Sequence, residues 1–260
     1  MQPLRLALLQ VQTHWHDPAS NRALFAPLIE SVADRSDLVV LPEMFSTGFT
    51  MAGAAVAETM DGATVSWLRG IAQAGHVTVC GSVVINDNGQ IYNRFIWTNG
   101  EDLGHYDKRH LFRMGGEHEH YAMGKVRSIF QVGDWRICPL VCYDLRFPVW
   151  FRNTNDYDAL VCVANWPALR RDAWLTLLRA RAIENQVYSA GVNIVGTDGN
   201  DVSYTGGTSA YGPDGETLVE RFDKAGIELI TFDPGQLTRL REAFPVWRDA
   251  DRFSIGTGED

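Results

Sequence analysis

Cys142 stands where an apolar segment meets a polar turn, a position that suits a catalytic nucleophile. Residues 135–142 read Trp-Arg-Ile-Cys-Pro-Leu-Val-Cys, and Tyr-Asp-Leu-Arg-Phe-Pro follows them. A thiol in the middle of a strand is an inert core residue, whereas a thiol at a strand end can face a cleft. The backbone N–H of Tyr143 can then point at the oxyanion that develops on an attacked carbonyl. These residue types suggest a cysteine hydrolase if other segments supply a base and a cation.

Glu43 and Lys108 also lie at the ends of strand-like segments and could supply these two groups. Glu43 follows the run Leu-Val-Val-Leu-Pro, and Lys108 lies in the polar stretch 105–112 beyond an apolar segment. A cysteine hydrolase needs a base for the thiol proton and an acid for the leaving group, and one carboxyl can serve as both. An ammonium group can stabilise the oxyanion. Taken alone, Glu43 could equally cap the turn after its strand, and Lys108 could be an ordinary surface charge.

Three motifs around these residues resemble those of the nitrilase (carbon–nitrogen hydrolase) superfamily. They are Leu-Pro-Glu-Met-Phe at 41–45, Tyr-Asp-Lys-Arg-His-Leu-Phe at 106–112 and Val-Cys-Tyr-Asp-Leu-Arg-Phe-Pro at 141–148. Their order is that of the family, and the stretch 179–186 resembles one of the family's helices. The resemblance therefore spans nearly the whole chain.

The resemblance implies a four-layer αββα sandwich and a catalytic triad of Glu43, Lys108 and Cys142 that acts through a thioester. It also implies a second glutamate, which we assign to Glu117 because this residue stands seven positions before a glycine. Glu119 is the alternative if the alignment shifts by two residues. The second glutamate is expected to orient Lys108 and the attacking water. Homodimers are usual in the superfamily, so a homodimer is expected here.

Among the branches of this superfamily, the chain most resembles the ω-amidases, in its compact length and in the stretch Ala-Asn-Trp-Pro at 164–167. The ω-amidases release ammonia from 2-oxoglutaramate and 2-oxosuccinamate. Such a substrate carries a carboxylate at its far end, and a guanidinium group is well suited to bind it. Arg146, Arg170 and the adjacent Arg171 are the candidate carboxylate ligands.

The walls of the substrate pocket are predicted at Trp166 and Phe45. Arg146 has a second interpretation, as a scaffold residue tied to Asp144 or Glu184. Arg109 is expected to form a structural salt bridge rather than to touch the substrate.

Other functions fit parts of the same pattern. A nitrilase or an N-carbamoyl amine hydrolase would use the same triad on a different substrate. A Cys–His hydrolase would replace Glu43 by one of the seven histidines. A non-catalytic scaffold or binding module would keep the fold and lose the activity.

No metal or cofactor is expected, because a thiol, a carboxylate and an ammonium complete the chemistry. His118 and His120 stand two residues apart without a third ligand motif, which is a weak metal signal. Cys80, Cys138 and Cys162 lie in apolar runs without paired spacing, so they are predicted to be buried thiols.

The elements that must position these residues indicate an α/β protein. Helical patterns at 21–34, 62–74 and 172–187, the second after a cap at Asp61, lie between strand-like segments. Those segments are 4–11, 38–41, 77–85, 95–98, 135–142, 159–164 and 189–196, followed by a hairpin at 204–221 and a strand at 227–232. This alternation predicts sheets covered by helices. No repeat or low-complexity linker interrupts it, so residues 1–260 are predicted to form a single domain.

Composition narrows the class of molecule that the protein is expected to bind. The chain has 260 residues, 45% of them hydrophobic, and a formal net charge of −9 without a basic tract. This argues against binding to nucleic acid or to an anionic membrane surface. No apolar run reaches the roughly 18 residues of a membrane span, and the first residues lack the layout of a signal peptide. We expect a cytoplasmic enzyme whose partners are a small-molecule amide and water.

Overall fold

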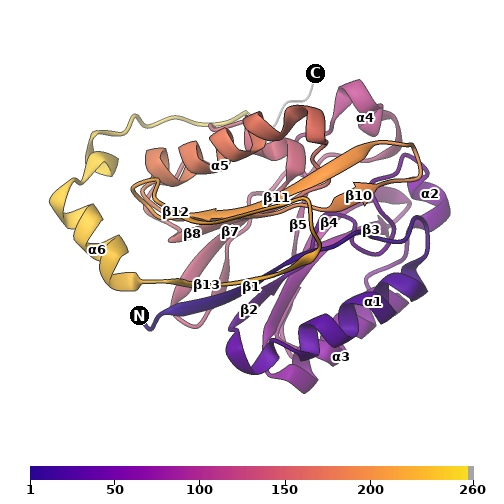
Figure 1. Ribbon diagram of the computed structural model, residues 1–260. Coiled ribbons are helices and arrows are strands. Elements are labelled where there is room, and N and C mark those ends of the chain that lie inside the picture. Colours follow the sequence, from indigo (N-terminus) through magenta and orange to yellow (C-terminus); the bar gives the residue numbers. More distant parts are fainter. Residues whose placement is uncertain (257–260) are drawn as a thin grey trace.

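The computed structural model describes residues 1–256 as two mixed β-sheets that pack against each other between helices (Figure 1). The first sheet has six strands in the order β13-β1-β2-β3-β4-β5. The second has seven, in the order β10-β11-β9-β8-β7-β6, with β12 paired to β11. Helices α1 and α3 cover the first sheet and α5 covers the second (Figure 1). This arrangement confirms the predicted four-layer sandwich.

The strands of the first sheet are β1 (Leu4–Gln10), β2 (Leu38–Val40), β3 (Thr78–Asp87), β4 (Gln90–Thr98), β5 (Leu103–Asp107) and β13 (Gly226–Phe232). Those of the second sheet are β6 (Phe130–Val132), β7 (Trp135–Val141), β8 (Ala159–Val163), β9 (Tyr188–Val192), β10 (Val195–Thr197), β11 (Ser203–Tyr211) and β12 (Thr217–Phe222). The longer helices are α1 (Pro18–Glu30), α3 (Ala63–Gly75), α5 (Arg171–Asn185) and α6 (Pro234–Ala243). Two short helices, α2 (Gly53–Val56) and α4 (Glu117–His120), complete the set.

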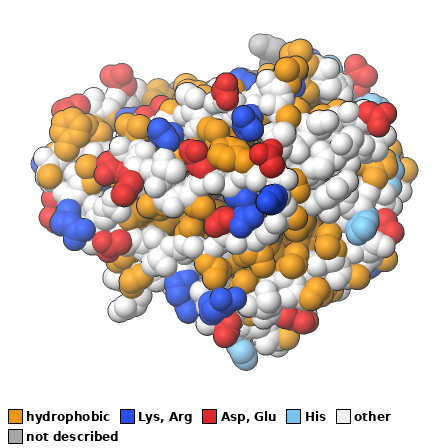
Figure 2. All heavy atoms as spheres, viewed as in Figure 1, with side chains coloured by type: hydrophobic (Ala, Val, Ile, Leu, Met, Phe, Trp, Pro, Cys, Tyr) orange, Lys and Arg blue, Asp and Glu red, His pale blue; other side chains and the backbone are white. Residues whose placement is uncertain are grey.

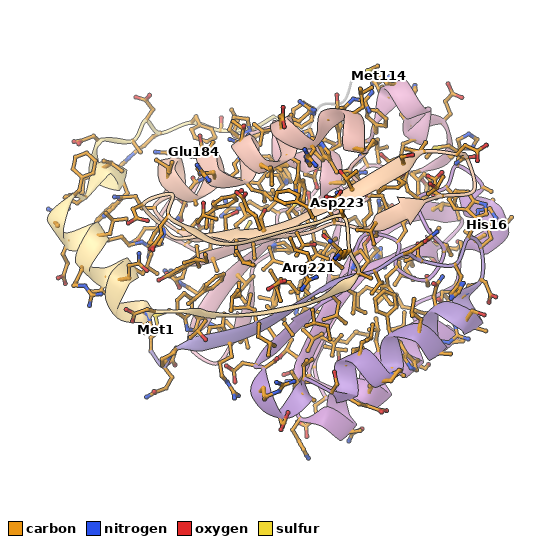
Figure 3. All side chains as sticks on the ribbon, in the orientation of Figure 1. Met1, His16, Met114, Glu184, Arg221 and Asp223 are labelled. Atoms are coloured by element: carbon orange, nitrogen blue, oxygen red, sulfur yellow. The ribbon has the colours of Figure 1, made fainter. Side chains whose placement is uncertain are left out.

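The apolar runs are continuous because both faces of the central strands are buried. In β1, Leu6 and Leu8 join the core between the two sheets, whereas Ala7 and Leu9 join the core beneath α1 and α3. Side chains alternate between the two faces of a strand, so a strand with two buried faces needs apolar residues at every position. Figure 3 shows the side chains that fill the space between the layers.

The helix boundaries differ from those predicted, for reasons of capping. Helix α1 begins three residues earlier, because the Asp17 side chain accepts the N–H of Ser20 and a proline occupies the first turn. The predicted cap of α3 at Asp61 is wrong. Gly62 is the N-cap residue, and the N–H of Thr64 instead donates a hydrogen bond to Glu58 Oε2 at 2.7 Å.

Several elements had no strong signal in the sequence. Strand β5 and helix α6 were not predicted, and the expected strand at 189–196 is two strands, β9 and β10. Within the described residues, no helix is both long and apolar enough to cross a membrane. On the face drawn in Figure 2, acidic and basic side chains are interspersed among hydrophobic ones.

Candidate active site

Glu43, Lys108 and Cys142 each follow the carboxyl end of a strand. Glu43 lies three residues beyond β2, Lys108 directly follows β5, and Cys142 directly follows β7. The first two strands belong to one sheet and the third to the other. The three side chains therefore meet at the boundary between the sheets, although 65 residues separate the glutamate from the lysine.

Lys108 lies between two carboxylates. Its Nζ is 3.0 Å from Glu43 Oε1 and 2.9 Å from each carboxylate oxygen of Glu117, and all three side chains are fully buried. Burial alone would lower the pKa of Lys108, but the charges of Glu117 and Glu43 outweigh it and raise this pKa well above its usual range. The two carboxylates therefore favour the charged form of the Lys108 side chain.

Glu117 is the second glutamate that the structure brings to this cluster. It begins the short helix α4, and its Oε2 accepts the N–H of Phe112 at 2.6 Å. Burial raises the pKa of Glu117, and the nearby Lys108 charge only partly offsets this effect. The alternative, Glu119, has a side chain that is 68% exposed and lies outside the cluster.

The carboxylate of Glu43 is held at both oxygens. Oε1 accepts Asn93 Nδ2 at 2.8 Å in addition to Lys108, and Oε2 accepts the backbone N–H of Asn165 at 2.8 Å. Asn93 is itself fixed, because the hydroxyl of Ser82 donates to its Oδ1 at 2.8 Å. Asn93 and Asn165 were not predicted, and for Asn165 the available signal was its place in the 164–167 stretch.

Cys142 occupies a strained backbone position at the start of a tight turn. Its φ is +46°, in the left-handed region that residues with a side chain rarely adopt. Asp144 secures this turn by accepting the N–H of Val141 at 3.1 Å and the hydroxyl of Tyr106 at 2.9 Å. Asp144 also accepts the N–H of His110 at 2.9 Å, which ties the turn to the loop of Lys108. Asp144 thereby connects the turn of Cys142 to the loop of Lys108.

The electrostatic surroundings keep the Cys142 thiol protonated at rest. Removal of the sulfur from water and the charge of Glu43 raise its pKa well above the usual range, although Lys108 acts in the opposite direction. The thiol lies 4.0 Å from the carbonyl oxygen of Asn165. A thiol of this kind needs a base at the moment of attack, and Glu43 is the adjacent carboxylate.

A cavity of about 610 Å³ leads from the surface to Cys142. Tyr143, Arg146, Trp166 and Arg170 line it, as the sequence suggested, together with Phe49 and Tyr204. The guanidinium of Arg146 lies 4.8 Å from the centre of the Trp166 ring, and that of Arg170 lies 5.6 Å from the centre of the Phe112 ring. The cavity thus combines aromatic walls with two guanidinium groups, the Lys108 ammonium and the carboxylate of Asp198.

Arg146 is not a scaffold residue tied to Asp144 or Glu184. Glu184 pairs with Arg181 at 2.8 Å, and Asp144 is occupied by Tyr106 and His110. Within residues 1–256, no carboxylate forms an ion pair with Arg146. Its charge is therefore available to a ligand in the cavity.

Three expectations for individual residues are wrong. Phe45 does not line the cavity: it is fully buried beneath the helices and packs edge-on against Phe25, with ring centres 5.5 Å apart. Arg171 lies over the ring of Phe222, outside the cavity lining. Arg109, expected in a salt bridge, donates to the carbonyl oxygen of Gly124 at 3.1 Å.

The remaining cysteines and histidines lie outside this cluster. Cys80, Cys138 and Cys162 are buried, which confirms the prediction, and burial raises the pKa of Cys138 to about 12. Among the described residues, no group of three or more histidine, cysteine, aspartate or glutamate side chains is placed to hold a metal ion.

Comparison with known proteins places these features in context. The family model for carbon–nitrogen hydrolases matches residues 5–242. The chain is 44% identical to omega-amidase YafV of Escherichia coli (strain K12), over 98% of this chain and 100% of that protein. It is 32% identical to the 2-oxoglutaramate amidase of Bacillus subtilis (strain 168), over 94% and 96% of the two chains.

A crystal structure gives a similar result. XC1258 from Xanthomonas campestris, a CN-hydrolase superfamily protein with an arsenic adduct in its active site, is 43% identical to this chain. The two structures superpose with a TM-score of 0.96, over 98% of this chain and 100% of the other.

Proposed function

Since the chain belongs to the carbon–nitrogen hydrolase family, we propose that it is an ω-amidase that releases ammonia from 2-oxoglutaramate or 2-oxosuccinamate. Glu43, Lys108 and Cys142 would be its catalytic triad, with Glu117 as a fourth catalytic residue. The observation that carries this proposal is the position of the Cys142 thiol. It faces a cavity with two cationic side chains and is adjacent to a buried ammonium with two carboxylates.

Acylation begins when Glu43 removes the proton from Cys142. The sulfur forms a bond to the amide carbon, and the carbonyl electrons move onto oxygen. Lys108 supplies a fixed positive charge for this oxyanion, and the N–H of Tyr143 adds a second donor. This N–H lies in the first turn of the 3₁₀ helix Cys142–Arg146, where N–H groups lack an intrahelical acceptor. The oxyanion collapses, the C–N bond breaks, and the nitrogen takes the proton of Glu43 to leave as ammonia.

Deacylation repeats these steps with water. Glu43 removes a proton from a water molecule, whose oxygen attacks the thioester carbon. The second oxyanion collapses, the C–S bond breaks, and the sulfur regains its proton from Glu43. Glu117 keeps Lys108 in place through both steps with its two hydrogen bonds of 2.9 Å, and it helps to orient the water. The net reaction converts an amide and water into a carboxylic acid and ammonia.

The cations of the cavity fit the distal carboxylate of the substrate. Arg146 and Arg170 both line the cavity, and the guanidinium carbon of each lies over an aromatic ring. A guanidinium held in this way loses less conformational freedom when it binds a carboxylate through two hydrogen bonds. Trp166 would form the wall against which the carbon chain of the substrate packs.

A screen of ammonia release tests this function. The purified protein is offered 2-oxoglutaramate, 2-oxosuccinamate, an aliphatic nitrile and an N-carbamoyl amine, with Cys142→Ala as the inactive control. We expect the ω-amides to be hydrolysed with the highest kcat/KM. Turnover of the nitrile or the carbamoyl compound without turnover of either ω-amide would assign the protein to another branch of the family.

Mass spectrometry tests the non-catalytic alternative. Intact mass after brief exposure to an alkylating agent should show one modified cysteine, mapped to Cys142, because the other three cysteines are buried. An unreactive Cys142 in a protein that releases no ammonia would instead support a scaffold or binding module. The homodimer and the cytoplasmic location stay predictions, to be checked by light scattering and cell fractionation.

A further inference from the structure

Asn165 makes three hydrogen bonds to Glu43. Its backbone N–H reaches Oε2 at 2.8 Å, and its Nδ2 reaches the backbone oxygen of Glu43 at 2.7 Å and Oε2 at 3.3 Å. Both neighbours of Nδ2 are acceptors, which fixes which atom of the side-chain amide is nitrogen. The side-chain oxygen, Oδ1, must therefore point away from Glu43.

This oxygen has no partner. Asn165 is only 4% exposed, and its Oδ1 is buried without a hydrogen bond to any of the described residues. A buried acceptor without a donor is costly, so natural proteins rarely keep one without a use. Nine buried side-chain polar atoms lack a partner among the described residues, and only that of Asn165 belongs to a residue lining the cavity of Cys142.

The two oxygens of Glu43 are not equivalent. Oε1 accepts from Lys108 at 3.0 Å and from Asn93 at 2.8 Å, whereas Oε2 accepts from Asn165 alone, through its N–H at 2.8 Å and through its Nδ2 at the longer distance of 3.3 Å. Oε2 accepts no hydrogen bond from the Lys108 ammonium and its second hydrogen bond is long, so it is the oxygen better able to take the Cys142 proton. The carbonyl oxygen of Asn165 lies 4.0 Å from the thiol, so Asn165 borders both the base and the nucleophile. A substrate nitrogen that receives the proton from Oε2 must lie beside this asparagine.

We propose that Oδ1 of Asn165 accepts a hydrogen bond from the amino group of the substrate amide and holds the nitrogen beside Oε2 of Glu43. A primary amide has two N–H groups, and one of them fills the empty acceptor. When the C–N bond breaks, its electron pair stays on the nitrogen, which takes the proton from Oε2 and leaves as ammonia. Asn165 is thereby a specificity residue for amides, a role that rests on the proposed amidase chemistry.

A comparison of an amide with its ester tests this role, because an ester has no N–H to offer. The substrates are 2-oxoglutaramate and the ω-methyl ester of 2-oxoglutarate, and kcat/KM reports the acylation step for both. We expect Asn165→Ala to lower kcat/KM for the amide by about tenfold more than for the ester, the effect of one lost hydrogen bond. Asn165→Leu, which keeps the side-chain volume, serves if the alanine variant does not fold.

Asn93→Ala is the matched control. It also removes an amide donor to Glu43, at Oε1, but the Oδ1 of Asn93 is already occupied by Ser82. We expect this variant to lower kcat/KM for the amide and the ester by the same factor. The contrast between the two variants separates contact with the leaving group from positioning of the base.

Equal losses on both substrates in the Asn165 variants would overturn the inference, since Asn165 would then act only through Glu43. The outcome is independent of the preferred substrate. If the wild type hydrolyses another amide instead of 2-oxoglutaramate, the proposed substrate fails, and the same comparison is made with that amide and its ester. A protein that hydrolyses no amide would overturn both proposals.

Discussion

At the scale of single residues, the cavity presents two guanidinium groups that the structure leaves free to bind an anion. We expect Arg146→Ala and Arg170→Ala to raise KM for 2-oxoglutaramate by about tenfold to a hundredfold, the effect of lost hydrogen bonds to a charged group. Steady-state kinetics on 2-oxoglutaramate and on a neutral aliphatic amide measure the effect, which should be confined to the charged substrate.

Arg171→Ala is the control for these variants. Arg171 adjoins Arg170 in the sequence, but its guanidinium lies 5.2 Å from the centre of the Phe222 ring, outside the cavity lining. We expect this variant to keep the KM of the wild type. An equal rise in KM in all three variants would point to a long-range effect of charge rather than to direct contact.

Glu43 has a test of its own. Glu43→Gln keeps the size of the side chain and one oxygen acceptor but removes the base, so we expect kcat to fall by about 10²–10⁴. Burial and the charge of Glu43 raise the pKa of the Cys142 thiol, so removal of this charge should not slow alkylation of the thiol at neutral pH. Ammonia release and intact mass measure the two effects.

A histidine variant completes the experiment. His110 is linked to Asp144 at 2.8 Å rather than to the thiol, so His110→Gln should retain most of the activity. Turnover that survives in Glu43→Gln and is lost in a histidine variant would favour a Cys–His hydrolase.

Residue type at the ends of apolar segments made Glu43, Lys108 and Cys142 candidates, and the resemblance of the three motifs to those of the nitrilase superfamily was needed to predict them as neighbours. Asn93 and Asn165 could not be found in this way. Their importance depends on which acceptors the folded chain places around their amide groups. Phe45 was misjudged because its place in the motif does not reveal which side of the chain faces the helices.

At the scale of elements, Asp158 joins three of them. It directly precedes β8 and pairs at 2.8 Å with Arg136 of β7 and at 2.8 Å with Arg241 of α6. Burial alone would raise the pKa of Asp158, but the hydrogen bonds and charges of the two arginines hold it below its usual value. Ionised Asp158 therefore stabilises the packing of α6 on the second sheet.

We expect Asp158→Asn to lower the free energy of unfolding by about 1–3 kcal/mol at neutral pH. A carboxyl with a lowered pKa stabilises the fold above its unfolded value, here 3.8, and the effect disappears as pH falls through the folded pKa. The difference between wild type and variant in urea unfolding should thus shrink below about pH 4. A difference that is the same at pH 3 and pH 7 would contradict this explanation.

The elements with a strong apolar rhythm were predictable, and those held by polar contacts were not. Strand β5 reads Leu-Gly-His-Tyr-Asp, and only its tyrosine is fully buried. The predicted strand at 189–196 breaks at Asn193, whose Nδ2 donates to the carbonyl oxygens of Trp166 and Gly206. Such breaks depend on partners far along the chain, which a local pattern does not contain.

At the scale of the whole molecule, one apolar core joins the two sheets. Leu6 and Leu8 of the first sheet belong to the same cluster as Ile137 and Val161 of the second, and α5 contributes Trp174 to it. Neither sheet can lose its partner without exposing this cluster to water. We therefore propose that residues 1–260 fold as a single domain.

Unfolding in urea tests the single domain. Tryptophan fluorescence and far-UV circular dichroism should give the same midpoint, because the tertiary core and the secondary structure are lost together. Ammonia release should disappear over the same range of urea concentration. Two separated transitions by the two probes would indicate that the sheets unfold independently.

The position of Glu43 and Cys142 after strands of different sheets has a consequence for a chain that is still being made. Asn165, whose backbone N–H donates to Glu43, follows Glu43 by 122 residues in the sequence. Strand β1 also pairs with β13, which is made much later. A nascent chain that already carries the cysteine still lacks the bonds that orient its base. We therefore expect no ammonia release from a nascent chain until Asn165 has been made and the second sheet has packed on the first.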